Sequence, residues 1–332
     1  MTKPQIAVQM MMLKDKVAEN GIYETLKTLS GMGFNAVEIS QLDMTEENVV
    51  AMEKAIQDFG INICSLSAYT QQIHPSFPVD SFDLHYDKII SDAKRLNVEY
   101  LRIGMLPFSM FGDVEKVVQF AKEMDKWGEK LSAEGIKLFY HNHHLEFDKV
   151  DGKSYFDMLL ENTNPENIGF EIDVHWIQRA GLNPVTVIEN LQGRAELVHL
   201  KDFRIATPDP EAMMGALAKG DMSVFFNTIQ FAEIGEGNLD FKAIIKAILK
   251  SNCEPSFFSS DGAKDKVIAE LKEKIGDKNV FLFRIHDVPD MDKINDLAVF
   301  ARKLDFKFQP DRKKLNKQQS KENIMERKKS SL

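Results

Sequence analysis

The sequence predicts an α/β protein in which eight parallel strands alternate with helices and close into a (β/α)8 TIM barrel. Short apolar runs of strand length recur along the first 200 residues, and a helix-length segment separates each run from the next. Strands and helices that alternate in this way form right-handed βαβ units and a parallel sheet. Seven such units exceed a small doubly wound sheet, whereas a closed barrel uses about 250 residues, which the 332-residue chain can supply.

The expected elements can be placed along the chain one by one. Thr45 opens a helix that extends to Asp58, because apolar residues recur there at helical spacing and Gly60 follows. A second helix of this kind covers Val114–Ala133. The eighth strand is expected near Pro255–Asp261, after a helix over Leu239–Lys250. The other seven strands are expected at Gln5–Met10, Ala36–Ile39, Ile61–Leu66, Tyr100–Gly104, Ile136–Tyr140, Ile168–Ile172 and Leu197–Leu200.

The C-terminal part of the sequence has a different character. We expect the barrel to occupy residues 1–261, with an irregular or incomplete eighth unit, because Pro255 removes a backbone donor from a strand that should pair on both sides. Residues 262–310 continue the β/α rhythm weakly and form an atypical α/β extension. Residues 311–332 carry eight Lys/Arg against three acids and many polar residues, which predicts a basic, disordered tail.

Composition excludes several classes of protein. The 23 Phe can help to bury a large core, which argues against a disordered chain. The net charge of −9 weighs against nucleic acid or an anionic membrane as the main partner. Two cysteines, Cys64 and Cys253, cannot form a disulfide framework or a thiolate zinc cage. We expect a cytoplasmic protein, because the sequence shows neither a signal peptide nor an apolar run near the ~18 residues of a membrane span.

Histidines and carboxylates gather where three neighbouring strands are expected to end. These strand ends are residues 140–146, 171–176 and 199–202, and five of the eight histidines lie between residues 141 and 199. A barrel carries its chemistry at the carboxyl ends of its strands. The clustering therefore predicts a metal site or an acid/base site at this end of the barrel.

One set of these residues could bind a divalent ion. Glu146, Asp173 and His199 come from separate strand ends, and strands about 4.8 Å apart bring such side chains together. The set contains no thiolate, so Mn²⁺, Mg²⁺, Co²⁺ and Zn²⁺ are all candidates. An ion of this kind polarises a carbonyl and stabilises an enediolate, while a nearby carboxylate or histidine moves a proton.

Five motifs in this sequence resemble those of the sugar phosphate isomerase/epimerase family, the xylose isomerase-like TIM barrels. They occur in the family's order and cover roughly residues 5–250. The motifs are Gly33–Glu38, Tyr140–Phe147 (which matches YHNH-x-x-EF), Phe170–Asp173, Val198–Asp202 and Ile234–Phe241.

The resemblance implies a divalent metal and a small-molecule sugar, keto-sugar or polyol substrate. It implies isomerisation or epimerisation through a 1,2-enediolate, or a related elimination. Asp173 and His199 would be metal ligands, and Glu146 would be either a ligand or an acid that contacts the substrate. His143 would share that catalytic role, and Lys201 is a further catalytic candidate. The residues expected to bind the sugar are Glu38, Arg102, His141, His175 and Trp176.

One departure from the family pattern leaves alternatives open. The family supplies a last carboxylate from strand eight, whereas Ser259 stands at that place in Cys253–Asp261. Serine is a weak neutral ligand, so a catalytically impaired sugar-binding barrel is one alternative. A keto-sugar lyase or dehydratase of the same family is another, and a nucleic-acid-processing enzyme is less favoured. A homo-oligomer is an open alternative for the assembly.

A shorter segment resembles a different family. Residues 264–318, around Arg284-x-His286-x-x-Pro289, are similar to part of the catalytic domain of ribonuclease R. The clustered aspartates that bind magnesium in those enzymes are missing from the sequence, so nuclease activity is not expected. A chain joined from two unrelated genes near residue 251, a misassembled reading frame and natural divergence are the alternatives that would account for the change in character.

Overall fold

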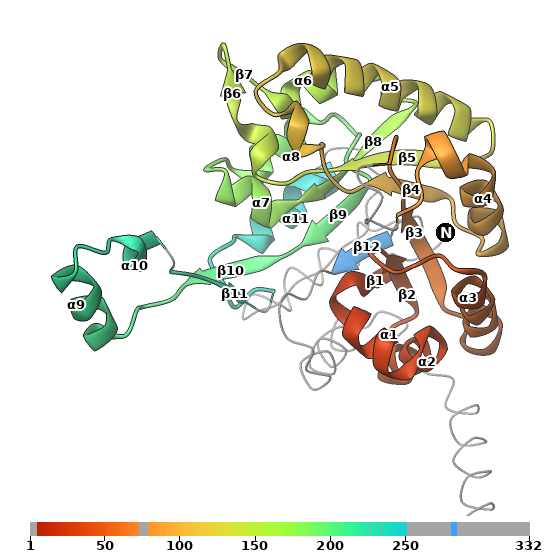
Figure 1. The fold of residues 1–332 in the computed structure, drawn as a ribbon, viewed down its shortest axis with the longest axis horizontal. Coiled ribbons are helices and arrows are strands. Elements are labelled where there is room, and N and C mark those ends of the chain that lie inside the picture. Colours follow the sequence, from red (N-terminus) through yellow and green to blue (C-terminus); the bar gives the residue numbers. More distant parts are fainter. Residues whose placement is uncertain (1–4, 73–78, 227, 233, 251–279, 284–332) are drawn as a thin grey trace, which may run out of the picture.

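Eight parallel strands form one closed barrel in the computed structural model of the chain (Figure 1). The structure describes residues 5–72, 79–226, 228–232, 234–250 and 280–283. Neighbouring strands in the barrel follow the order β1-β12-β9-β8-β5-β4-β3-β2, which confirms the predicted (β/α)8 class. Their bounds are β1 (Gln5–Gln9), β2 (Ala36–Ile39), β3 (Asn62–Ser67), β4 (Tyr100–Ile103), β5 (Lys137–His141), β8 (Ile168–Asp173), β9 (Leu197–Leu200) and β12 (Val280–Phe283).

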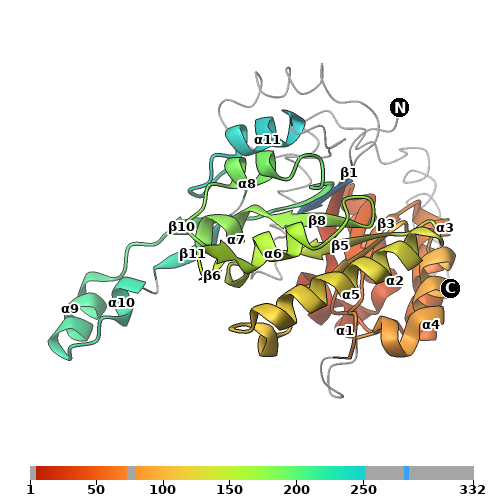
Figure 2. The ribbon, with the colours of Figure 1, turned by 90° about the horizontal axis from the view of Figure 1, so that it is seen from above.

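Helices lie on the outside of the barrel, between successive strands (Figures 1 and 2). The expected helix from Thr45 to Asp58 is confirmed as α3: the Thr45 side chain accepts a hydrogen bond from the Asn48 N–H, and Gly60 ends the helix at φ 69°. The helices are α1 (Lys14–Asn20), α2 (Ile22–Met32), α3 (Glu46–Phe59), α4 (Phe82–Arg95), α5 (Val114–Ser132), α6 (Tyr155–Glu161), α7 (Val174–Arg179), α8 (Pro184–Asn190) and α11 (Phe241–Lys250), with short 3-10 turns at Met10–Leu13, Phe108–Met110 and Leu145–Phe147.

The strand that closes the barrel is β12, and not the segment Pro255–Asp261 where we expected it. Gln5 pairs with Val280 on one side, and Leu282 pairs with His199 on the other. Val280–Phe283 is an apolar run without proline, so its backbone can donate to both neighbours, which Pro255 cannot do. Pro255–Asp261, Ser259, the boundary at residue 261 and the basic tail lie outside the described residues.

Two antiparallel hairpins interrupt the barrel pattern, and neither was expected from the sequence. The smaller hairpin pairs β6 (Lys149–Val150) with β7 (Lys153–Ser154). The larger pairs β10 (Asp202–Ile205) with β11 (Ile229–Ala232) and carries α9 (Pro210–Ala218) and α10 (Ser223–Phe226) at its far end. Both ribbon views show this second hairpin and its helices projecting away from the barrel (Figures 1 and 2). We refer to residues 202–232 as the arm.

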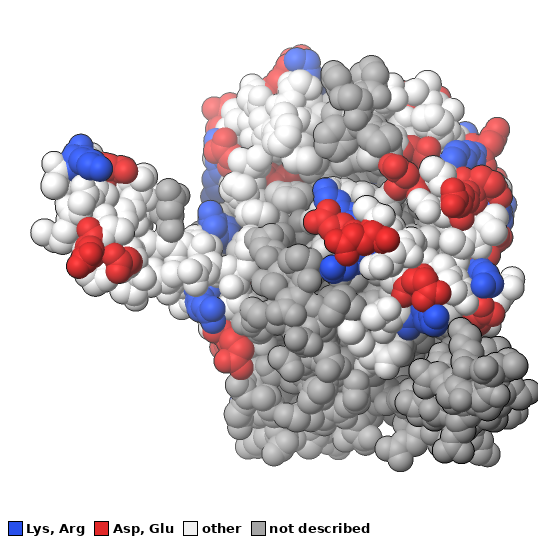
Figure 3. Space-filling view, turned by 60° about the horizontal axis from the view of Figure 1, so that its bottom comes forward, with Lys and Arg blue, Asp and Glu red and all other residues white. Residues whose placement is uncertain are grey.

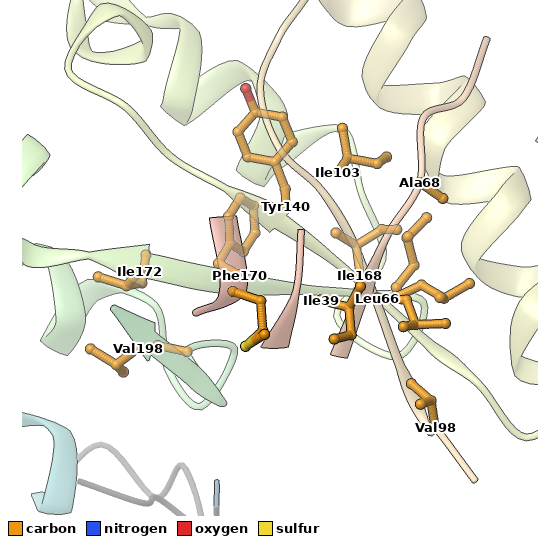
Figure 4. Packing of buried hydrophobic residues seen from close by; sticks show 14 of the residues in the cluster. Ile39, Leu66, Ala68, Val98, Ile103, Tyr140, Ile168, Phe170, Ile172 and Val198 are labelled. Carbon is orange, nitrogen blue, oxygen red and sulfur yellow. The ribbon is translucent and has the colours of Figure 1, made fainter. Parts of the chain in front are cut away.

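The apolar core divides into two clusters, as expected for strands whose successive side chains point to opposite faces. Leu138 and Tyr140 belong to the large cluster, whereas Phe139 between them belongs to a small one. The small cluster is Ala7, Ala36, Cys64, Phe139 and Leu197. Figure 4 shows members of the large cluster from successive strands, including Ile103, Tyr140, Phe170 and Val198. Helices therefore cover one face of the sheet, and the small cluster fills the interior of the barrel.

Close packing of a helix against the sheet gives a first testable prediction. A Cβ atom at Gly128 of α5 would lie 2.6 Å from the carbonyl oxygen of Asn167 and 2.8 Å from Ile168 Cδ1, whereas a Cβ at Gly31 of α2 would meet nothing within 4 Å. We expect Gly128→Ala to lower the free energy of unfolding by about 1–3 kcal/mol. The control Gly31→Ala should leave it unchanged or raise it by up to about 1 kcal/mol. Urea unfolding followed by circular dichroism measures both, and equal effects would contradict the packing.

The described surface carries charges of both signs. Acidic and basic side chains stand beside one another on the face in Figure 3, and the described part of that face shows no continuous basic area. Among the described residues, no helix combines the length and the apolar character that a membrane crossing needs.

Candidate metal centre

Ionisable side chains occupy the interior positions of five barrel strands, one layer above the small apolar cluster. The two-residue period of a strand puts positions i and i+2 on the same face. Glu38 follows Ala36 by two residues, His141 follows Phe139, and His199 follows Leu197, and each of the three earlier residues belongs to the interior cluster. Arg102, Glu171 and Asp173 complete the layer, and all six side chains are buried. The carboxyl-terminal mouth of the barrel therefore holds a buried group of six ionisable residues.

Arg102 is the cation of this layer. Its Nε lies 2.7 Å from Glu38 Oε1 and 3.4 Å from Glu171 Oε2, and its Nη2 donates a 2.7 Å hydrogen bond to Ser40 Oγ. Burial acts to raise the pKa of Glu38, but the charge of Arg102 and the hydrogen bonds with His199 and Glu171 outweigh it and lower that pKa to about 2. Burial and the neighbouring Glu38 charge raise the pKa of Glu171 well above its usual value. Glu38 is thus the carboxylate that stays ionised.

His199 is held in an orientation that suits a metal ligand. Its Nε2 lies 3.1 Å from Glu38 Oε2, and burial lowers the pKa of His199, which favours the neutral ring. An ionised carboxylate can only accept, so the single ring proton belongs on Nε2. The Nδ1 lone pair then faces Asp173 Oδ2 at 3.9 Å, and Nδ1 makes no hydrogen bond within the described part of the chain. A carboxylate that fixes the tautomer of a histidine in this way is typical of metal sites.

His141 also contacts a buried carboxyl group, and it lies on β5, which β8 separates from the strand of His199. Its Nδ1 lies 3.1 Å from Glu171 Oε2, and its ring centroid lies 4.5 Å from that of His199. In the described part of the chain, two sets of three groups have ligand atoms within 4.8 Å of one another: His141–Asp173–His199 and Glu38–Glu171–His199. The first set fits an ion better, because the second would use the carboxylates that orient the two histidines and pair with Arg102.

Asp173 is placed by a network of hydrogen bonds. Its backbone N–H donates to Asn142 Oδ1 (3.0 Å), while the Asn142 amide donates to the Asp173 carbonyl (3.3 Å). One carboxylate oxygen, Oδ1, accepts from the Trp176 N–H at the start of α7. The other oxygen, Oδ2, is the one that faces His199. One carboxylate oxygen of Asp173 therefore caps a helix, while the other is available to a metal ion.

Glu146, which we expected to be a metal ligand or a catalytic acid, lies in neither set of three groups. Its Oε1 accepts a 2.7 Å hydrogen bond from the Tyr140 hydroxyl, and its Oε2 accepts a 2.9 Å bond from the His143 N–H. Burial raises the pKa of this carboxyl group. The structure therefore places Glu146 beneath the loop that carries His143, while His141, which we expected to bind the sugar, stands with Asp173 and His199.

The remaining expected residues lie around Trp176 and form an aromatic wall beside the candidate metal-binding set. Lys201 is buried, with its Nζ 4.3 Å from the ring centroids of both Trp176 and Phe231. The His175 ring lies 4.8 Å from Trp176, and the half-buried His143 lies 5.5 Å from the same indole. Phe231 belongs to β11 of the arm and was not expected at the site. The segment around Phe231 has no clear strand or helix pattern, so its position could not be predicted from the sequence. The pairing of β10 with β11 places Phe231 next to Lys201.

Asp202 anchors the arm next to this wall. Its Oδ2 accepts hydrogen bonds from the N–H groups of Gly235 (3.0 Å) and Gly237 (2.9 Å), and a Cβ atom at Gly237 would lie only 2.2 Å from Asp202 Oδ1. The two glycines thus shape the turn before α11. Because the Asp202 carboxylate already accepts from both N–H groups, this Gly-x-Gly forms a turn and not a phosphate loop.

A closed parallel barrel with histidines and carboxylates at its carboxyl-terminal mouth defines a TIM-barrel protein with a candidate metal centre. The chain belongs to the xylose isomerase-like TIM barrel family, whose model matches residues 26–259.

Individual relatives are distant. The inosose dehydratase of Lacticaseibacillus casei is 25% identical over 158 residues, which cover 45% of this chain and 49% of that protein; the chain thus spans about half the length of that relative. A sugar phosphate isomerase/epimerase from Parabacteroides distasonis superposes with a TM-score of 0.64 at 18% identity, over 92% of this chain and 99% of that one. A structure of the IolI protein with a bound zinc has a TM-score of 0.57 at 14% identity, over 92% and 97%.

Proposed function

We propose that this chain is a metal-dependent isomerase or epimerase that acts on a sugar or keto-sugar through an enediolate. The observation that carries the proposal is the set His141–Asp173–His199, in which two imidazoles and one carboxylate meet at the mouth of the barrel. Support for a divalent ion comes from this donor set and from the zinc in the related IolI structure. Support for a sugar comes from the family to which the chain belongs.

His141, Asp173 and His199 would hold the ion, which when bound polarises a substrate carbonyl. The other side chains then do the remaining work. His143 stands at the rim beside His141, with ring centroids 4.9 Å apart, and takes the proton from the carbon next to the carbonyl. The electron pair of that C–H bond forms the enediolate. The Lys201 ammonium, in its aromatic surroundings, stabilises the charge that develops on the substrate oxygen.

The step that follows proton removal distinguishes an isomerase or epimerase from a dehydratase. Return to the other face of the same carbon gives an epimer, and delivery to the neighbouring carbon gives an isomer. Loss of a hydroxide from the next carbon, protonated to water, gives a dehydration. The second candidate, a keto-sugar or inosose dehydratase, is favoured by the inosose dehydratase relative. Both candidates share the first proton transfer.

Deuterium exchange tests this shared step before any product is known. The full chain, supplied with Mn²⁺, is incubated in D₂O with fructose, xylulose and scyllo-inosose, and proton NMR follows loss of the hydrogen next to the carbonyl. Exchange above a metal-stripped control supports the proposal, and the product that accumulates decides between epimer, isomer and dehydrated ketone. A complete lack of exchange and turnover would favour the impaired, sugar-binding barrel.

The role of His143 gives a second prediction. We expect His143→Ala to slow the exchange about 10²–10⁴-fold, the usual contribution of a positioned general base. His144→Ala is the matched control, because His144 is the next residue and its ring stacks on Trp176 at a centroid distance of 4.9 Å. That control should retain exchange within about threefold. Equal losses in the two variants would show that His143 does not transfer the proton.

A further inference from the structure

A cavity of about 510 Å³ lies at the same end of the barrel as the candidate metal centre and takes no part in the chemistry proposed above. Its walls come from the loops that follow β2 and β3 and from the first turns of α4. The volume falls within the roughly 300–1,000 Å³ of small-molecule sites. The loops after barrel strands form the face where such barrels bind their substrates.

Arg102 connects this cavity with the ionisable layer. Ser40, in the cavity wall, accepts the 2.7 Å hydrogen bond from Arg102 Nη2, and Ser67, also in the wall, is the strand-register partner of Arg102. The candidate ligands come from the adjacent strands β5, β8 and β9, whereas the cavity lies at β2 and β3. A ligand with one end at the ion could therefore place its other end over Ser40 and Ser67.

Apart from Asp43, Asp80, His85 and Lys88, the polar side chains that line the cavity are neutral hydrogen-bonding groups. The Ser67 hydroxyl is buried and has no hydrogen-bond partner among the described residues, as expected of a group that a ligand completes. The cation in the wall, Lys88, is held by Asp80 at 2.6 Å and by Asp92 at 2.9 Å. A cation already paired with two carboxylates does not favour a phosphate. Leu42 and Met44 supply apolar surface, so the lining suits a neutral, hydroxylated ring.

We propose that this cavity is a second subsite for a neutral sugar ring, so that a disaccharide or another glycoside is preferred as substrate over a free hexose. This inference rests on the proposed function, because it presumes that the reacting sugar lies at the metal centre. The hydroxyl of Ser67 hydrogen-bonds the second ring, while Ser40 remains the partner of Arg102.

Binding measured by isothermal titration calorimetry tests the subsite without any need for turnover. The full chain, supplied with Mn²⁺, is titrated with glucose and fructose, then with cellobiose, maltose and leucrose, and finally with glucose 1-phosphate. We expect at least one disaccharide to bind tenfold or more tightly than its component hexoses. Ser67→Leu, which fills the cavity, should abolish this gain and leave hexose affinity within twofold. Ser67→Ala, which removes only the hydroxyl, should reduce the gain three- to tenfold.

The other outcomes would contradict the subsite, the neutral ring or the proposed function, and they can be told apart. Hexose binding with no gain for any disaccharide would overturn the subsite and leave the proposed function standing. A gain that survives in both Ser67 variants would do the same. Tighter binding of glucose 1-phosphate than of every disaccharide would overturn the neutral-ring assignment. If no sugar binds, the proposed function fails, and the subsite fails with it. Metal content and circular dichroism of each variant separate these results from misfolding.

Discussion

Replacing Arg102 with methionine is expected to destabilise the protein by about 3–5 kcal/mol. The substitution keeps the bulk of the side chain but leaves the buried carboxyl groups of Glu38 and Glu171 without their cation. The free energy of unfolding, measured in urea by circular dichroism, reports the loss. Adding Glu38→Gln to the Arg102→Met variant should recover part of it, because the uncompensated charge is then removed.

Arg95 provides a matched control for this prediction. Like Arg102 it pairs with two glutamates, Glu46 and Glu53, but it does so at the surface, and the Glu46 side chain is 73% exposed. Solvent screens such pairs, so Arg95→Met should cost less than about 1 kcal/mol. Similar losses in the two methionine variants would contradict the view that burial makes the Arg102 pairs indispensable.

Asp173→Asn is expected to abolish turnover while the fold is retained. Asparagine can still accept the hydrogen bond from the Trp176 N–H that begins α7, and Asn is as good a helix cap as Asp. It replaces the oxygen that faces His199 with an amide nitrogen, which does not ligate a metal. A metal ion contributes several kcal/mol to such a reaction, and each 1.36 kcal/mol is a factor of ten. Activity should therefore fall about 10³-fold or more.

The measurements that check this variant are the deuterium exchange rate, the metal content and the free energy of unfolding of the metal-free protein. We expect the exchange rate and the metal content to fall sharply. The free energy of unfolding of the metal-free protein should change by less than about 1 kcal/mol. An Asp173→Asn protein that exchanges at the wild-type rate would remove Asp173 from the chemistry. A large loss of stability would show that the residue acts mainly through the fold.

Most of the barrel could be predicted from the sequence, because its signals are local. Seven strands are short apolar runs, and α3 has both its cap at Thr45 and its terminating Gly60 in the sequence. The eighth strand could not be placed, because two candidate runs follow α11 and only pairing with β1 and β9 selects Val280–Phe283. The arm was missed because its two strands pair across an insertion of helices, which leaves no local hairpin signal.

The candidate site was predictable as a region but not as a set of contacts. The strand ends brought Asp173 and His199 together as expected. The two-residue period of a strand, which also puts His141 and Glu171 inside the barrel, can be seen in the sequence. The orientation of the Glu146 side chain cannot be predicted from any such period. Only the structure shows that Glu146 accepts hydrogen bonds from Tyr140 and His143, and that Glu38 and Glu171 contact ring nitrogens of His199 and His141, the two candidate ligands.

The metal content of the wild-type protein and of two variants decides which residues hold the ion. Elemental analysis after saturation with Mn²⁺ or Zn²⁺ and gel filtration should find about one ion per chain in the wild-type protein. Glu146→Gln, which preserves the shape of the side chain, should keep that ion. His141→Ala should lose it while remaining folded by circular dichroism. An ion that is lost with Glu146 and kept without His141 would contradict the site described here.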